Sequence, residues 1–166
     1  MVRYHEKRFL WDMLRKKDII LKQEELSDKN IWRTNMKKVV TFGVYDYFHL
    51  GHLRLFKNAK KLGDWLIVAV QDGDYILKTK PNAKVMYTTE QRKELVGALR
   101  VVDEVVSYTD VDVTIKTLDF DVFAVGEDQN HAGFQRAIEW CKENGKEVVR
   151  MKRTPGICSS EIKKSL

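Results

Sequence analysis

The fold is set by the stretch VVTFGVYDYFHLGH, residues 39–52. Its first four residues form a run of β-branched and aromatic side chains, which predicts a buried strand over 39–42. Gly43 then interrupts the run and lets the backbone turn sharply and approach a ligand closely. Apolar side chains recur with helical spacing over 52–62, and Gly63 ends that pattern. The stretch therefore predicts a strand, a tight turn and a helix in succession.

The alternation of strand and helix continues toward the C-terminus. The pattern predicts further strands over 65–70, 101–106, 122–125 and 147–151, and further helices over 89–99, 113–118, 134–144 and 159–166. Such alternation is typical of right-handed βαβ units, whose ligands lie at the carboxyl ends of the strands. We therefore expect an α/β fold, with a Rossmann-like parallel sheet of about five strands and helices on both faces.

Residues 1–36 differ from the rest, because they carry runs of charge and neither glycine nor proline. Their apolar side chains recur at near-helical spacing, which predicts an N-terminal helical extension packed on the main domain or on a partner subunit. We expect residues 37–166 to form one further domain.

Composition argues against several other classes of function. The chain has 166 residues and a formal net charge of +6, with the basic residues dispersed among acidic ones. This dispersal argues against a nucleic-acid partner. The apolar run 65–70 is too short to cross a membrane, and no Cys/His cluster has the spacing of zinc ligands. We expect a cytoplasmic protein without a membrane partner or a metal site of its own, although a nucleotide could bring Mg²⁺.

Two histidines follow the predicted first strand. Backbone N–H groups at a helix start bind phosphate, and the imidazoles of His49 and His52 could donate hydrogen bonds to phosphoryl oxygens or, when protonated, neutralise charge. Gly51 removes a side chain between them. The alternative is that one histidine only caps the helix and the other is exposed.

A second motif, RTPGICSSEI, occupies residues 153–162. Arg153 offers a fixed fork for phosphate oxygens, and Ser159 and Ser160 begin the last predicted helix, where hydroxyl and N–H groups hold anions. The alternative is an ordinary turn followed by a helix cap.

Together the two motifs resemble those of the cytidylyltransferases, a branch of the nucleotidyltransferases that carry HxGH, and most closely the bacterial glycerol-3-phosphate cytidylyltransferases. The first motif is similar to G-[TI]-F-D-x-x-H-x-G-H, and the second to R-T-x-G-I-S-T-[TS]-x-I. The resemblance covers 37–166. Val44, Tyr45, Pro155 and Cys158 depart from the usual residues.

The resemblance implies catalytic roles for His49, His52, Lys80 and Arg153. Lys80 is expected on a mobile basic loop, with Lys78 as the second candidate. CTP contacts are implied for Phe42, Gly43, Val44, Asp46, Gly51, Arg92, Gly126, Asp128, Thr154, Gly156, Ile157, Ser159 and Ser160. Arg92 could touch the nucleotide or brace the site, and Arg100 and Asp103 could form an ion pair. The candidate acceptor-binding residues are Lys78, Gln129, Asn130 and His131, the last three as a polar wall.

The activity implied is transfer of CMP from CTP to a small phosphorylated alcohol, with Mg²⁺, in a homodimer. Glycerol-3-phosphate is the default acceptor; phosphocholine, phosphoethanolamine, a pentitol phosphate and a phosphorylated amide such as phosphoglutamine are the others. The polar wall favours a polar ester over phosphocholine. An FMN adenylyltransferase and a nucleotide-binding module without catalysis remain the alternatives.

Overall fold

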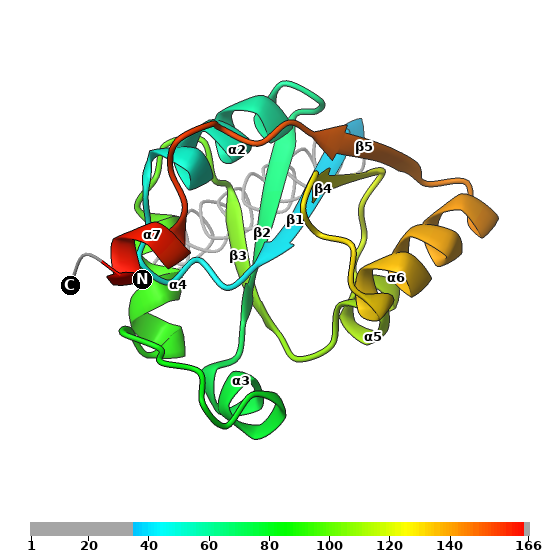
Figure 1. Ribbon diagram of the computed structural model, residues 1–166. Coiled ribbons are helices and arrows are strands. Elements are labelled where there is room, and N and C mark those ends of the chain that lie inside the picture. Colours follow the sequence, from blue (N-terminus) through cyan, green and yellow to red (C-terminus); the bar gives the residue numbers. More distant parts are fainter. Residues whose placement is uncertain (1–34, 165–166) are drawn as a thin grey trace, which may run out of the picture. The chain divides into compact units, whose positions relative to one another are not determined.

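The computed structural model describes residues 35–164. The predicted N-terminal helical extension therefore lies almost wholly outside the described residues. The described part has helices on both faces of one sheet (Figure 1). No helix in it is long and apolar enough to cross a membrane.

The sheet is parallel and has five strands in the order β3-β2-β1-β4-β5, as expected. The strands are β1 (Lys38–Gly43), β2 (Trp65–Gln71), β3 (Glu104–Tyr108), β4 (Val122–Gly126) and β5 (Glu147–Met151). The chain runs outward from β1 to β2 and β3, and then returns to place β4 on the other side of β1. Neighbouring crossovers diverge at this switch point, so a crevice opens at the carboxyl ends of β1 and β4.

The helices divide between the two faces. They are α2 (Leu50–Lys60), α3 (Gly73–Thr79), α4 (Thr89–Gly97), α5 (Val111–Thr114), a 3₁₀ turn η1 (Ile115–Thr117), α6 (Ala132–Glu143) and α7 (Ser159–Lys164). The apolar sides of α5, η1 and α6 form one core cluster with side chains such as Phe42 and Phe123. Those of α2 and α4 form the other with Val39 and Leu66. Alternate residues of β1 thus face opposite cores, as a central strand requires.

Local sequence explains where the helices begin. Thr88 caps α4 in a capping box, in which its side chain accepts from the N–H of Gln91 and the Gln91 side chain accepts from the N–H of Thr88. The carboxylate of Asp72 caps α3 by accepting from the N–H of Tyr75.

Two predictions about elements were wrong. The strand expected over 101–106 is β3 at Glu104–Tyr108, because Val101 and Val102 pack against the core from the turn after α4 rather than from a strand. The segment expected as a mobile basic loop is in part helical, since α3 extends to Thr79. This helix was not predicted because it is short and because the Asp-Gly-Asp sequence at its start is typical of a turn.

Candidate active site

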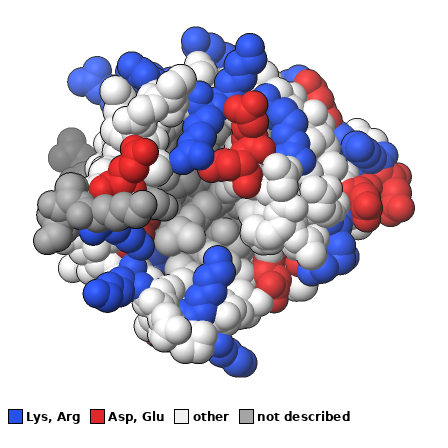
Figure 2. All heavy atoms as spheres, in the orientation of Figure 1, with Lys and Arg blue, Asp and Glu red and all other residues white. Residues whose placement is uncertain are grey.

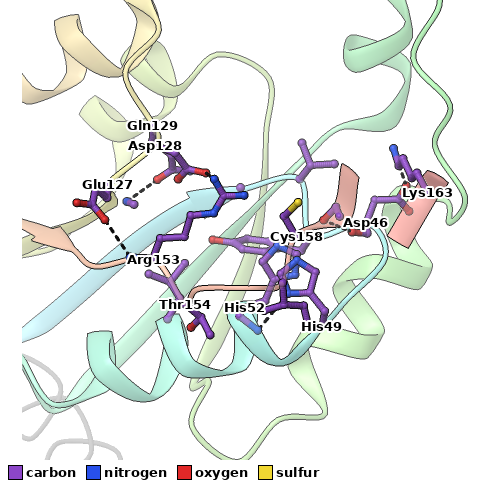
Figure 3. A pocket seen from close by; sticks show the side chains of 18 of the residues that line it. Asp46, His49, His52, Glu127, Asp128, Gln129, Arg153, Thr154, Cys158 and Lys163 are labelled. Atoms are coloured by element: carbon purple, nitrogen blue, oxygen red, sulfur yellow. Dashed lines mark hydrogen bonds and ion pairs between the residues drawn. The ribbon is translucent and has the colours of Figure 1, made fainter. Parts of the chain in front are cut away.

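A cavity of about 510 Å³ opens at the carboxyl ends of β1 and β4, where Gly43 and Gly126 end the two strands. Basic side chains gather around a hollow near the middle of the face shown in Figure 2, with acidic side chains beside them. Figure 3 shows Arg153 beside Glu127 and Asp128 at one end of the pocket, Lys163 beside Asp46 at the other, and both histidines between them.

The loop after β1 has an unusual backbone. Tyr45 and Tyr47 have φ angles of 55° and 49°, in the left-handed region that residues other than glycine rarely occupy. The Tyr45 ring folds back so that a Cβ on residue 43 would lie 2.6 Å from it, which is why only glycine fits there. The buried ring packs edge-on against Phe56 and His52. Strained conformations of this kind concentrate at functional sites.

His49 both caps α2 and lines the cavity. Its Nδ1 accepts a hydrogen bond from the N–H of Gly51 at 3.1 Å. Its ring stacks on that of His52 with centroids 3.9 Å apart. A Cβ on residue 51 would lie 2.8 Å from the His49 ring, so Gly51 makes room for that ring. The capping alternative is thus correct for His49, whereas His52 is half-buried rather than exposed.

Both histidines are held neutral. Burial, and secondarily the neighbouring His49, lowers the pKa of His52 to about 3. Burial, and secondarily Arg153, lowers the pKa of His49. Because Nδ1 of His49 is an acceptor, its proton in the neutral form is on Nε2. The histidines are therefore neutral donors, and positive charge comes from arginine and lysine.

Arg153 supplies positive charge at one end of the cavity. Its guanidinium lies 3.8 Å from the carboxylate of Asp128, and its backbone N–H donates to Glu127 at 3.2 Å. The Arg153 side chain is 51% exposed and lines the cavity. A polyphosphate there would meet a planar fork of N–H groups.

Arg92 braces the site and does not line it. Its side chain is fully buried, and its donors go to the backbone oxygens of Val44, Gln71 and Tyr87 at 2.7–3.1 Å. The sequence left open whether Arg92 touches the nucleotide or braces the site. Because its side chain is buried and its donors are engaged by backbone oxygens, Arg92 braces the site, and the CTP contact implied by the resemblance is not supported. Asp103 likewise pairs with Lys60 at 2.5 Å, not with Arg100.

The structure does not form the polar wall expected from residues 129–131. The Gln129 amide donates to the backbone oxygen of Phe42 at 2.7 Å and accepts from the N–H of Gly126 at 2.8 Å, so it joins β1 to β4. Asn130 bonds the backbone of Glu127, and His131 precedes α6 and packs on Phe134. Of the three, only Gln129 lines the cavity.

Most of the other expected residues do line the cavity: Gly43, Val44, Asp46, His49, Gly51, His52, Lys80, Gly126, Asp128, Arg153, Thr154, Ile157 and Ser159. Gly156 lines an adjoining pocket of about 440 Å³. Phe42 is a core residue, Lys78 lies on α3 away from the cavity lining, and the side chain of Ser160 is outside the described part. Sequence reasoning missed Lys84, Lys152 and Lys163, which also line the cavity, as does Cys158 of the second motif.

The carboxylates of the cavity are engaged within the protein. Asp46 accepts from two backbone N–H groups, and Glu127 and Asp128 contact Arg153. No cluster of three or more His, Cys, Asp or Glu residues suited to a metal ion occurs between residues 35 and 164.

The fold and this cavity define an α/β nucleotide-binding protein with the donors that phosphoryl chemistry uses. Comparison with known proteins narrows this class, because residues 40–165 match the family described as cytidylyltransferase-like. The chain belongs to this family.

Relatives with two activities are similar to the chain. The glycerol-3-phosphate cytidylyltransferase of Bacillus subtilis is 34% identical, over 79% of this chain and 98% of that protein. The FAD synthase of Ferroglobus placidus is 39% identical, over 75% of this chain and 84% of that protein. Among solved structures, the lipopolysaccharide core biosynthesis protein of Thermoplasma volcanium is 28% identical, covers 72% of this chain and has a TM-score of 0.62.

Proposed function

We propose that the protein transfers CMP from CTP to glycerol-3-phosphate, forming CDP-glycerol and pyrophosphate. The observation that carries this proposal is the stacked histidine pair, which lines one cavity together with Arg153. The similarity to glycerol-3-phosphate cytidylyltransferases over nearly their whole length supports the choice of nucleotide and acceptor. We also propose that the enzyme is cytoplasmic and acts as a homodimer.

The reaction is a direct in-line displacement. A phosphate oxygen of the acceptor forms a bond to the α-phosphorus of CTP, and the bond from that phosphorus to the bridging oxygen breaks, so pyrophosphate leaves with the electron pair. The acceptor phosphate is already anionic, so the step needs no strong general base. The Nε2–H group of His49 and the ring N–H of His52 donate to the α-phosphoryl oxygens, where negative charge increases in the transition state.

Arg153 and Lys80 hold the β- and γ-phosphates. Lys80 follows the last residue of α3 and lines the same cavity as Arg153, so both cations are available to the leaving group. Mg²⁺ would bind through triphosphate oxygens and water and supply further charge neutralisation. This agrees with the engagement of Asp46, Glu127 and Asp128 in contacts within the protein.

A second candidate is an FMN adenylyltransferase. The FAD synthases are similar at comparable identity. In addition, Gly126-Glu127-Asp128-Gln129 resembles the G-x-D-Q sequence of archaeal FAD synthases. The Gln129 amide joins β1 to β4, and this contact fits a site for CTP as well as a site for ATP. The Arg153-Thr154-x-Gly156-Ile157 signature favours the cytidylyltransferase.

The experiment is a panel of acceptors with CTP and Mg²⁺, followed by pyrophosphate release and mass identification of the product. We expect glycerol-3-phosphate to give the highest kcat/KM, above phosphocholine, phosphoethanolamine and a pentitol phosphate. His49→Ala and His52→Ala should each lower kcat by about 10² or more, the scale for losing one transition-state donor. Turnover of another ester above glycerol-3-phosphate would reassign the acceptor, and a change under tenfold in both variants would remove the histidines from the mechanism.

A further inference from the structure

Lys163 on α7 contacts two parts of the chain that are distant in sequence. Its ammonium group donates to the backbone oxygen of Lys84, 79 residues earlier, at 2.8 Å. It also lies 3.8 Å from Oδ2 of Asp46 and 4.9 Å from the centre of the Tyr47 ring, within range of a cation–π contact. One side chain of α7 thus joins the loop after β1 to the segment 80–88.

The buried carboxylate of Asp46 adds contacts between the loop after β1 and the segment 80–88. Its carboxylate is 4% exposed, and its two oxygens accept from the N–H groups of Met86 and Tyr87 at 3.0 and 3.1 Å. Its backbone oxygen accepts from the Ser159 hydroxyl at 3.4 Å. A buried carboxylate needs several such partners, because an unpaired charge away from water is costly. Asp46 therefore requires both the segment 80–88 and α7 to be in place.

The two connected parts form facing walls of the cavity. The segment 80–88 contributes Lys80, Ala83, Lys84 and Val85 to its lining, and the C-terminal part contributes Ile157, Cys158, Ser159 and Lys163. Figure 3 shows Lys163 and Asp46 side by side at this end of the pocket.

Polar contacts connect α7 to the rest of the described structure. This helix has six residues, and those of its side chains that the structure describes are exposed or half-buried. Apolar burial therefore contributes little to fixing its position. The contacts of Lys163 and Ser159 with Asp46 and Lys84 connect it to the rest of the site.

We propose that Lys163 is a positioning residue that links α7 to the segment 80–88, so that the two walls enclose the nucleotide together. It acts through Asp46 and the Lys84 carbonyl, and brings Ser159 and Lys80 to the same substrate. The effect on catalysis rests on the proposed function, whereas the link itself is present without nucleotide.

The test compares Lys163→Met, which keeps the side-chain length and removes the charge, with Lys163→Arg, which keeps the charge and the donors. Lys142→Met, an exposed lysine in the last turn of α6, is the matched control. The first readout is hydrogen exchange at the Met86 and Tyr87 amides in the protein without nucleotide. Lys163→Met should accelerate it by about tenfold, because local opening governs such exchange.

The second readout is steady-state kinetics with CTP and glycerol-3-phosphate. Lys163→Met should lower kcat/KM for CTP by about tenfold, because the groups that position the nucleotide would then be slightly misplaced. Lys163→Arg should recover most of that loss, and Lys142→Met should behave as the wild type in both readouts.

Two results would overturn the proposal: Lys163→Met matching Lys142→Met in exchange and kinetics, or Lys163→Arg being as impaired as Lys163→Met. A wild-type protein that does not turn over CTP would contradict the proposed function instead, and the exchange data would still decide whether Lys163 links the two walls.

Discussion

His52 couples the catalytic site to the stability of the fold. Its ring lies against Tyr45 and Phe48 and stacks on His49, so the imidazolium form is disfavoured by burial and by the second histidine. The unfolded chain binds a proton near the ordinary pKa of 6.5, whereas the folded protein binds one only near 3. Acid therefore favours the unfolded state over the interval between these values.

We expect the free energy of unfolding to fall by about 2 kcal/mol between pH 7 and pH 5 on account of His52 alone. The free energy of unfolding falls toward low pH because the pKa of His52 is lower in the folded protein than in the unfolded chain. The stability that neutral His52 contributes is complete above pH 6.5 and is lost as the pH falls. Urea unfolding at the two pH values measures it. His52→Asn should remove most of that dependence, and an unchanged pH dependence in this variant would show that His52 is not held neutral.

Cys158 and Cys141 should differ sharply in reactivity. Burial raises the pKa of the Cys141 thiol to about 11, so about 10⁻³ of it is thiolate at pH 8. Cys158 is half-buried and lines the cavity. We expect a thiol reagent to label Cys158 first, and saturating CTP to slow that labelling at least tenfold if nucleotide occupies the cavity.

Cys158→Ser is the control for this labelling, because it should leave only the slow reaction of Cys141. Equal rates with and without CTP would place the nucleotide away from the C-terminal motif.

At the scale of elements, Arg92 holds the turn after β1 to β2 and to the start of α4. It contacts the backbone oxygens of Val44, Gln71 and Tyr87, and no other described side chain links these three segments in this way. Arg92→Met would leave those part-buried oxygens without their donors, and we expect the free energy of unfolding to fall by about 3 kcal/mol.

Thermal and urea unfolding measure the loss. Arg54→Met, a change at an exposed arginine of α2, is the control and should cost under 0.5 kcal/mol, about the usual size of a surface effect. Arg92→Lys should fall between the two, since one ammonium group cannot reach all three oxygens. A loss below about 1 kcal/mol for Arg92→Met would contradict the bracing role.

Elements with strong local patterns could be predicted from the sequence. β1, β2, β4 and β5 are short runs rich in β-branched side chains with clear ends, and the structure places them within a residue or two of the prediction. The predicted bounds of β3 were shifted because Val101 and Val102 are partly buried by tertiary packing outside a strand. α3 was missed because seven residues give too little periodicity.

The candidate site, too, could be predicted from the sequence only in part. The motif residues could be located because their spacing in the chain is short and specific. The roles of Gln129, Arg92 and Lys163 could not, because each depends on backbone oxygens supplied by distant segments. One signal was present for Lys163: it lies four residues after Ser159, on the same face of a helix.

At the scale of the whole molecule, we expect a homodimer. The similarity to the cytidylyltransferases and the apolar periodicity within residues 1–36 motivate this expectation. Light scattering at micromolar concentration should give twice the mass of the 19.5 kDa chain. Deletion of residues 1–36 tests whether the extension contributes, and a monomer in the intact chain would contradict the assembly.

The central claim is that the cavity binds CTP and transfers its CMP to a small phosphate ester. The most direct measurement is a competition in which the enzyme receives equal CTP and ATP together with equal glycerol-3-phosphate and FMN, and the products are identified by mass. We predict CDP-glycerol as the main product, with CTP consumed well before ATP. Accumulation of FAD, with ATP consumed first, would contradict the account.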